Sequence, residues 1–161
     1  MGHCYGALTI DDGDGGKMYD KIVVGTDGSP TALKAVAHAA SLAAATGANL
    51  HIAMVTPSIP VVVAPDMLLA SAEWSDATKQ ATHAALESAA EAAAAAGAET
   101  TTHQLSGDPA DALLSLCDDI DADLLVVGSR GMHGARRFLL GSVSSRCAHH
   151  ANRSVLIVHT D

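Results

Sequence analysis

The sequence has few aromatic and few charged residues. Phe, Trp and Tyr make up 2% of its 161 residues and charged residues 17%, whereas 48% are hydrophobic, so the core has to be aliphatic. No apolar run approaches the ~18 residues of a membrane-spanning helix, and no basic and apolar leader marks a signal peptide. The length suits one ordinary domain. We therefore expect a soluble, intracellular single-domain protein.

Cysteines and basic residues are also scarce. The three cysteines form no CxxC pair, which argues against a disulfide framework or a zinc ribbon and favours a reducing cytoplasm. Nine basic residues against 18 acidic residues give a net charge of -9, which opposes binding to nucleic acid or to an anionic membrane. The P-loop and hydrolase-elbow motifs are absent, and Cys147, His149 and His150 have poor metal-ligand spacing. We predict no catalytic residue and no metal site.

Apolar runs alternate with helix signals beyond a glycine- and aspartate-rich lead. Residues 1–18 are expected to form a flexible acidic extension, and residues 19–161 the domain. The alternation predicts a single-domain α/β fold with an open parallel sheet and helices on both faces, and a proline-containing loop over residues 56–65 that could cover the site. The expected strands are 22–24, 50–55, 99–105, 124–127 and 155–158, and the expected helices are 30–46, 67–96, 110–117 and 142–150.

The first helix is expected to begin at Ser29-Pro30, with a serine cap and a first-turn proline, and to stop before Gly47. Its apolar spacing predicts an inner face that consists of Leu33, Val36, Ala37, Ala40 and Ala44.

The most informative stretch runs from Gly128 to Ser142, directly after a buried strand. Gly128, Gly131 and Gly141 can bring backbone N–H groups close to a phosphate chain, and Ser142 opens a helix whose positive end favours an anion. Three of the nine Lys and Arg residues, Arg130 among them, lie inside this loop. Such glycines can also build a plain surface loop. The preceding strand, the helix start and the arginines together favour nucleotide phosphate binding.

This motif resembles the nucleotide-binding signature of the ATP-binding universal stress proteins. Residues 21–29, Gly107-Asp-Pro109 and residues 155–158 match other parts of that family, and the resemblance covers about 19–160 in the same order. It implies a Rossmann-like sheet with strand order 3-2-1-4-5. The first and fourth strands would then be neighbours, so Asp27 and the glycine motif would share one cleft.

The resemblance also implies roles for individual residues. Asp27 would contact the adenosine, and the backbone near Val55 would border the adenine. The remaining residues would surround the ribose and phosphates, with a backbone donor from Val143: Gly128, Arg130, Gly131, Gly141, Ser142 and Val143. Judged from its residues alone, Asp27 could equally cap a turn. Residues 152–154 depart from relatives, which often carry proline there.

These observations favour a cytoplasmic ATP-binding protein that acts as a nucleotide-responsive regulator or stress-protection factor, not an enzyme. Whether Mg²⁺ accompanies ATP, and whether AMP or a cyclic nucleotide is preferred, stays open. One alternative is a slow phosphohydrolase or nucleotidyl-transfer enzyme, which would need a positioned base and Mg²⁺-binding carboxylates. Another is a nucleotide-free structural dimer. The aliphatic edge strand Val155 to Val158 predicts a homodimer, as the resemblance also implies.

Overall fold

The computed structural model describes residues 18–56, 68–129 and 140–159. Nine elements alternate along the chain, as the sequence predicts, and their bounds agree with the expected ones to within about two residues. None of the helices in these ranges combines the length and apolarity of a bilayer span. The elements are β1 (Lys21–Thr26), α1 (Pro30–Thr46), β2 (Asn49–Thr56), α2 (Leu68–Ala95), β3 (Glu99–Ser106), α3 (Pro109–Asp119), β4 (Leu124–Gly128), α4 (Ser142–His150) and β5 (Ser154–Val158).

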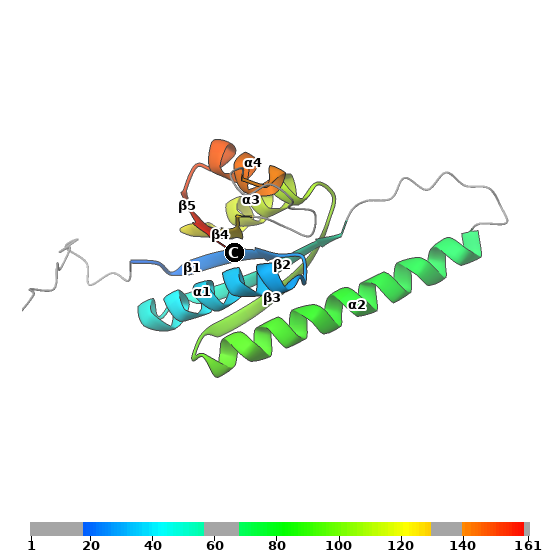
Figure 1. The fold of residues 1–161 in the computed structure, drawn as a ribbon, viewed down its shortest axis with the longest axis horizontal. Coiled ribbons are helices and arrows are strands. Elements are labelled where there is room, and N and C mark those ends of the chain that lie inside the picture. The colour runs from blue at the N-terminus through cyan, green and yellow to red at the C-terminus, as the bar shows by residue number, and fades with distance from the viewer. Residues whose placement is uncertain (1–17, 57–67, 130–139, 160–161) are drawn as a thin grey trace, which may run out of the picture.

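The five strands form one parallel sheet in the order β3-β2-β1-β4-β5, which confirms the predicted topology. Helices α1 and α2 cover one face of the sheet, and α3 and α4 cover the other (Figure 1). The order of the strands reverses between β1 and β4. A doubly wound sheet binds its ligands at such a reversal, beyond the carboxyl ends of the strands.

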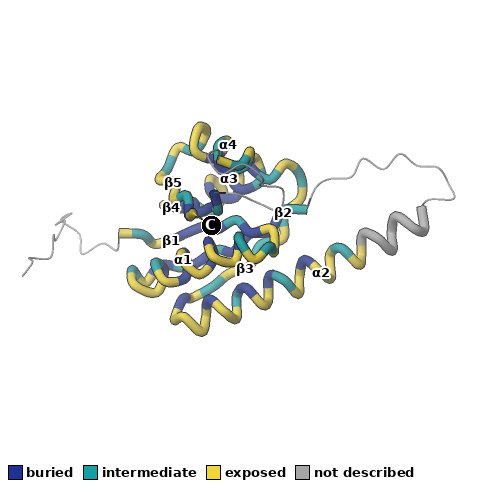
Figure 2. Tube along the Cα trace, viewed as in Figure 1, coloured by how far each residue is buried: buried dark blue, intermediate teal, exposed yellow. Residues whose placement is uncertain are grey.

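The two faces carry separate cores. Alanines of α1 and α2 pack against Ile22, Val24 and Ile52 on one face, and leucines of α3 pack against Val23 and Leu125 on the other. Figure 2 shows the buried residues concentrated along the central strands and the inner sides of the helices. The aliphatic core expected from the composition is therefore confirmed.

Helix α1 begins and ends as expected but presents a different face to the sheet. The Ser29 hydroxyl accepts a hydrogen bond from the N–H of Ala32 at 3.1 Å, and Gly47 ends the helix with φ of 69°. Leu33, however, is 45% exposed, and Ala37 and Ala44 are exposed too. This helix is so rich in alanine that its apolar spacing does not define one face. The buried residues are Ala32, Ala35, Val36, Ala39, Ala40 and Ala43.

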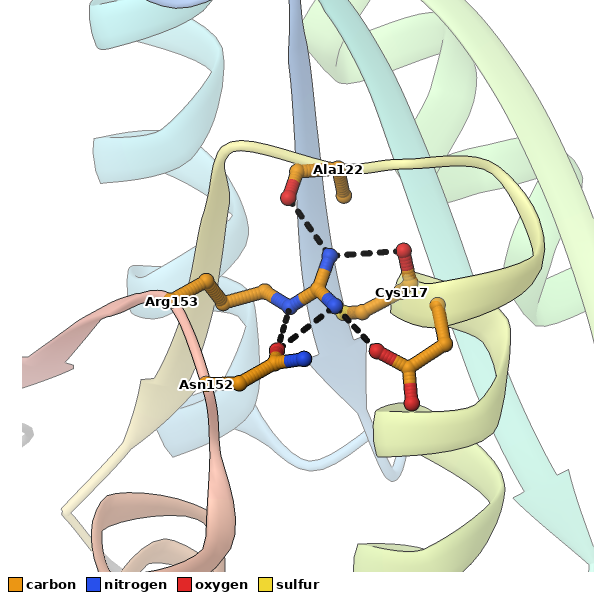
Figure 3. Close-up of polar contacts among 5 residues, drawn as sticks. Cys117, Ala122, Asn152 and Arg153 are labelled. Carbon is orange, nitrogen blue, oxygen red and sulfur yellow. Dashed lines mark hydrogen bonds and ion pairs between the residues drawn. The ribbon is translucent and has the colours of Figure 1, made fainter.

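Arg153 lies directly before the last strand. Its guanidinium donates to the carbonyl oxygens of Cys117 at 2.7 Å and Ala122 at 2.6 Å, and it contacts the Asp118 carboxylate and the Asn152 amide oxygen (Figure 3). The side chain is only 12% exposed. Arg153 therefore ties the end of α3 to the start of β5.

Two expected segments lie outside the described residues. They are the acidic lead, residues 1–17, and the connection between β2 and α2, residues 57–67.

Candidate functional site

The carboxyl end of β1 carries Asp27 in a tight turn. Thr26 pairs with Met54 of β2, so Asp27 and Val55 come next on the two neighbouring strands. Asp27 is exposed, and its Oδ1 accepts a hydrogen bond from the N–H of Ser29 at 3.0 Å. The carboxylate therefore shapes the turn that leads into α1. An exposed carboxylate in this position can serve the turn and still face a ligand.

The carboxyl end of β4 is fastened to the start of α4. Ser129 follows β4, and its carbonyl oxygen accepts hydrogen bonds from the N–H of Gly141 at 2.9 Å and from the hydroxyl of Ser144 at 3.3 Å. The N–H of Ser129 donates to the carbonyl oxygen of Val158 at 2.7 Å. The two ends of the glycine-containing loop are therefore joined beside the last strand. Residues 130–139, which include the expected site residues Arg130 and Gly131, lie outside the described residues.

Helix α4 opens toward this junction without a side-chain cap. Gly141 is its N-cap residue and offers no side-chain acceptor, so the cap itself supplies no hydrogen bond to the first turn. Ser142 is exposed, Val143 is half-buried, and the Ser144 hydroxyl points back to the carbonyl oxygen of Gly141 at 3.0 Å. First-turn N–H groups and the positive end of the helix dipole together favour an anion at this place.

Sheet register brings these ends into one row. Strand β1 pairs with β4 as far as Val24 and Val126 and with β2 as far as Thr26 and Met54, so Asp27, Val55 and Ser129 follow at the same end of the sheet. Neighbouring strands lie about 4.8 Å apart, so the three residues form a short row at the carboxyl ends of β2, β1 and β4. Six of the residues predicted for the site are described. They lie at the carboxyl ends of these strands or at the start of α4: Asp27, Val55, Gly128, Gly141, Ser142 and Val143.

A cavity of about 430 Å³ lies next to Asp27, on the side of the sheet that α2 covers. Its volume falls within the range of small-molecule sites. The sequence analysis missed the contribution of α2, although small residues repeat there at intervals of four, as in Ala77, Ala81 and Ala85. The lining residues are Asp27, Gly28, Met54, Ala77, Thr78, Ala81, Thr82 and Ala85.

Arg146 connects α4 to α3 and was also missed. Its guanidinium contacts the carboxylates of Asp108 at 2.7 Å and Asp111 at 2.6 Å. Asp108 also caps α3, accepting from the N–H of Ala110 at 3.0 Å and of Asp111 at 3.2 Å. The backbone N–H of Asp111 and the guanidinium hold the pKa of Asp108 below its ordinary value. The Gly-Asp-Pro turn therefore helps to orient the helix that faces the junction. In the sequence, the three-residue spacing of Asp108 and Asp111 was the signal that could have indicated a shared basic partner.

Groups of three or more His, Cys, Asp or Glu side chains that could hold a metal ion are absent from the described ranges.

Comparisons with known proteins find one family along the described residues. The family model for the universal stress protein family matches residues 18–159. A universal stress protein of Mycobacterium tuberculosis is 36% identical, over 88% of this chain and 97% of its own.

Two solved structures extend the similarity to protein–nucleotide complexes. A universal stress protein crystallised with cAMP is 38% identical, with a TM-score of 0.68 over 89% of this chain and 98% of its own. The universal stress protein of Archaeoglobus fulgidus in complex with dAMP is 25% identical, with a TM-score of 0.61 over 86% and 97%. Family model, relatives and fold agree over nearly the whole described domain, and the chain belongs to the universal stress protein family.

Proposed function

We propose that this protein binds an adenine nucleotide, with ATP as the expected ligand, and acts as a nucleotide-responsive regulator or stress-protection factor. The observation that carries the proposal is the start of α4, which has no side-chain cap and is fastened by Ser129 beside the carboxyl end of β1. A helix start in this place favours phosphate. The complexes of a 38% identical relative with cAMP and of a 25% identical relative with dAMP support an adenine nucleotide.

The ligand is proposed to span the row of residues at the carboxyl ends of β2, β1 and β4. Its phosphates and ribose would lie against Gly128, Gly141, Ser142 and the backbone N–H of Val143, with Arg130 and Gly131 contributing from the intervening loop. The adenosine would reach Asp27, and the backbone at Val55 would border the adenine. The adjoining cavity beside α2 gives the base an apolar wall of Met54 and alanines.

Binding rather than catalysis is proposed because general acid–base groups are sparse around this row. Asp27 is the one carboxylate among the described residues that line the row and the cavity. Phosphoryl transfer to water needs a positioned base and carboxylates that hold Mg²⁺. We therefore expect ATP turnover well below about one per second, the lower end of ordinary enzyme rates. Faster turnover by the purified protein would favour the phosphohydrolase alternative.

A homodimer in a reducing cytoplasm completes the proposal. Strand β5 lies at the edge of the sheet and leaves Leu156 38% exposed, as a strand awaiting a partner would. The two described cysteines are buried free thiols, which suits a reducing compartment.

The first test identifies the ligand directly. Mass spectrometry of the small molecules released from freshly purified protein should find an adenine nucleotide. Calorimetric titrations with ATP, AMP and cAMP would then rank their affinities.

The second test addresses the glycine motif. Gly141→Val and Gly131→Val should each weaken ATP binding at least about 100-fold, because a side chain would occupy the path of a phosphate. Ala148→Val is the matched control, since Ala148 is exposed on the same helix but away from its start. Circular dichroism should show unchanged helix content in all three. Unchanged ATP affinity in both glycine variants would mean that the loop has only a structural role.

A further inference from the structure

Two histidines face each other on neighbouring strands, away from the proposed nucleotide site. His51 of β2 pairs in register with Thr101, and His103 of β3 pairs with Ala53, so the two imidazoles form a diagonal cross-strand pair. Nδ1 of His51 lies 2.9 Å from Nε2 of His103, and the ring centroids are 5.1 Å apart. His51 precedes Val55 by four residues, about 13 Å along the strand, and His103 is level with Ala53, two residues or about 7 Å before Val55.

The surroundings of both rings favour their neutral form. Burial lowers the pKa of His51, which the charges of His103 and Lys21 lower further, and burial also lowers the pKa of His103. In the neutral pair one nitrogen donates its hydrogen and the other accepts it. Neutral imidazole is also the form that binds metal ions. Because both residues are only half-buried, an ion from solvent can reach the pair.

The separation of the two nitrogens is compatible with both rings binding one metal ion. Imidazole nitrogens bind divalent transition metals at about 2.0–2.1 Å, so two such ligands at a right angle lie about 2.9 Å apart. A tetrahedral arrangement would separate them by about 3.3 Å. The observed 2.9 Å, which is also an ordinary hydrogen-bond length, is compatible with adjacent positions of a tetragonal ion. Cu²⁺ and Ni²⁺ prefer tetragonal geometry and stand high in the general order of affinity.

We propose that His51 and His103 form a two-histidine binding site for a tetragonal divalent metal ion, of which Ni²⁺ is the probe. Water molecules would fill the remaining coordination positions. On binding, the hydrogen between the two rings moves to the other nitrogen of the ring that carried it. Both imidazoles then stay neutral, and each gives one lone pair to the metal.

Charges of both signs surround the pair. Lys21 lies on the same face of the sheet and opposes a cation, but its Nζ is fixed by a hydrogen bond to the carbonyl oxygen of Ile120 at 2.7 Å. Glu99 shares the face of His103 by the alternation of β3 and favours a cation. Asn49 Oδ1 already accepts a hydrogen bond from the Thr101 hydroxyl at 3.2 Å, so we do not count it as a ligand. Lys21 and Glu99 therefore act in opposite directions on a cation bound between the two rings.

The test is a calorimetric titration of the untagged full-length chain with NiCl₂ at pH 7. All proteins carry His3→Gln, because an amino terminus with histidine at the third position can itself chelate Cu²⁺ and Ni²⁺. We expect one Ni²⁺ per chain, and at least about 30-fold weaker binding in His51→Gln and in His103→Gln. His149→Gln, in which an exposed histidine of α4 is replaced, should bind as the parent does.

A second measurement does not depend on the folding of the variants. Substoichiometric paramagnetic Ni²⁺ should broaden the imidazole proton resonances of His51 and His103 in the parent protein before those of any other histidine. Absence of Ni²⁺ binding, equal isotherms for all variants, or first broadening at His149 or His150 would each overturn the proposal and leave the pair as a hydrogen bond only. ATP affinity should be the same in His103→Gln as in the parent, which separates this site from the nucleotide site.

Discussion

The two edges of the sheet are built from opposite kinds of sequence. Strand β3 reads Glu-Thr-Thr-Thr-His-Gln-Leu-Ser and exposes five of its eight residues to solvent, whereas β5 reads Ser-Val-Leu-Ile-Val. Polar and charged side chains protect an edge from pairing with another chain, but an aliphatic edge invites it. Strand β3 is therefore suited to remain unpaired on its outer side, whereas β5 is suited to pair with another chain.

Exposure along β5 supports this difference. Val155 and Ile157 pack into the core on the α3 and α4 side, while Leu156 points to the opposite face of the sheet and is 38% exposed. The strand is paired with β4 on one side along all five residues. A second copy related by a two-fold axis would cover the other side and place Leu156 of both chains at the interface.

The largest effect is expected from Leu156→Lys. This change removes one buried leucine from each copy and brings two like charges together, so the dimer should weaken by about 4 kcal/mol, or about 1,000-fold. Light scattering and sedimentation at micromolar concentration measure the change. Gln104→Lys is the matched control, because it adds the same charge to an exposed position of the other edge strand and should leave the dimer intact.

Two results would contradict the comparison of the edges. A monomeric parent protein at micromolar concentration would show that β5 does not join two copies. A dimer that Gln104→Lys dissociates and Leu156→Lys does not would show that the polar edge is the interface.

The second largest effect, a loss of stability, is expected from a change at the start of an edge strand. Strand β3 follows a turn at Gly97 with φ of 89°, whereas β5 is held by the guanidinium of Arg153. Arg153→Met should lower the free energy of unfolding by about 2 kcal/mol, because the carbonyl oxygens of Cys117 and Ala122 lose a charged donor. Urea unfolding measures this loss. Arg146→Met, at an exposed arginine, should have a smaller effect, and equal losses would show that burial of Arg153 does not matter.

The sequence predicted the sheet well because its signals are local. Ser29-Pro30, Gly47 and Asp108-Pro109 act through caps and turns that depend only on neighbouring residues, and each marks a helix end in the structure. The aliphatic runs marked the buried strands for the same reason. The strand order came from the family resemblance, since periodicity does not determine which strands pair.

The missed features depend on distant contacts. Alanines surround α1 on several sides, so only packing against the sheet shows that Ala35 and Ala39 face inward and Leu33 outward. The cavity wall on α2 and the hydrogen bonds from Arg153 to α3 likewise join segments far apart in the sequence. For the candidate site, the sequence predicted residues at the carboxyl ends of the central strands but not the contribution of α2 beside them.

A smaller effect should arise where β3 ends. Gly107 has φ of 121°, a conformation that other residues adopt only under strain, and an added Cβ would meet no atom within 4 Å. Gly107→Ala should therefore lower stability by about 1–2 kcal/mol through backbone strain alone. Urea unfolding again gives the value. No loss for Gly107→Ala would mean that the turn relaxes.

The smallest effect is the pH dependence of stability that His51 and His103 contribute. The pKa values of His51 and His103 are lowered in the folded protein, chiefly because burial disfavours the charged rings, whereas in the unfolded chain both lie near 6.5. The unfolded state therefore binds more protons just below pH 6.5. The resulting stability is fully present above that pH and is lost as the pH falls through the folded values.

The urea midpoint should consequently fall between pH 7 and pH 5.5 by more in the parent protein than in the double variant His51→Gln/His103→Gln, with a metal chelator present throughout. Both rings are half-exposed, so solvent screening keeps the difference small. Other groups contribute equally to both proteins and cancel in the comparison. His149→Gln should keep the full pH dependence, because its histidine lies on exposed α4 surface. If the double variant lost stability as steeply as the parent, the two histidines would not be the source of this pH dependence.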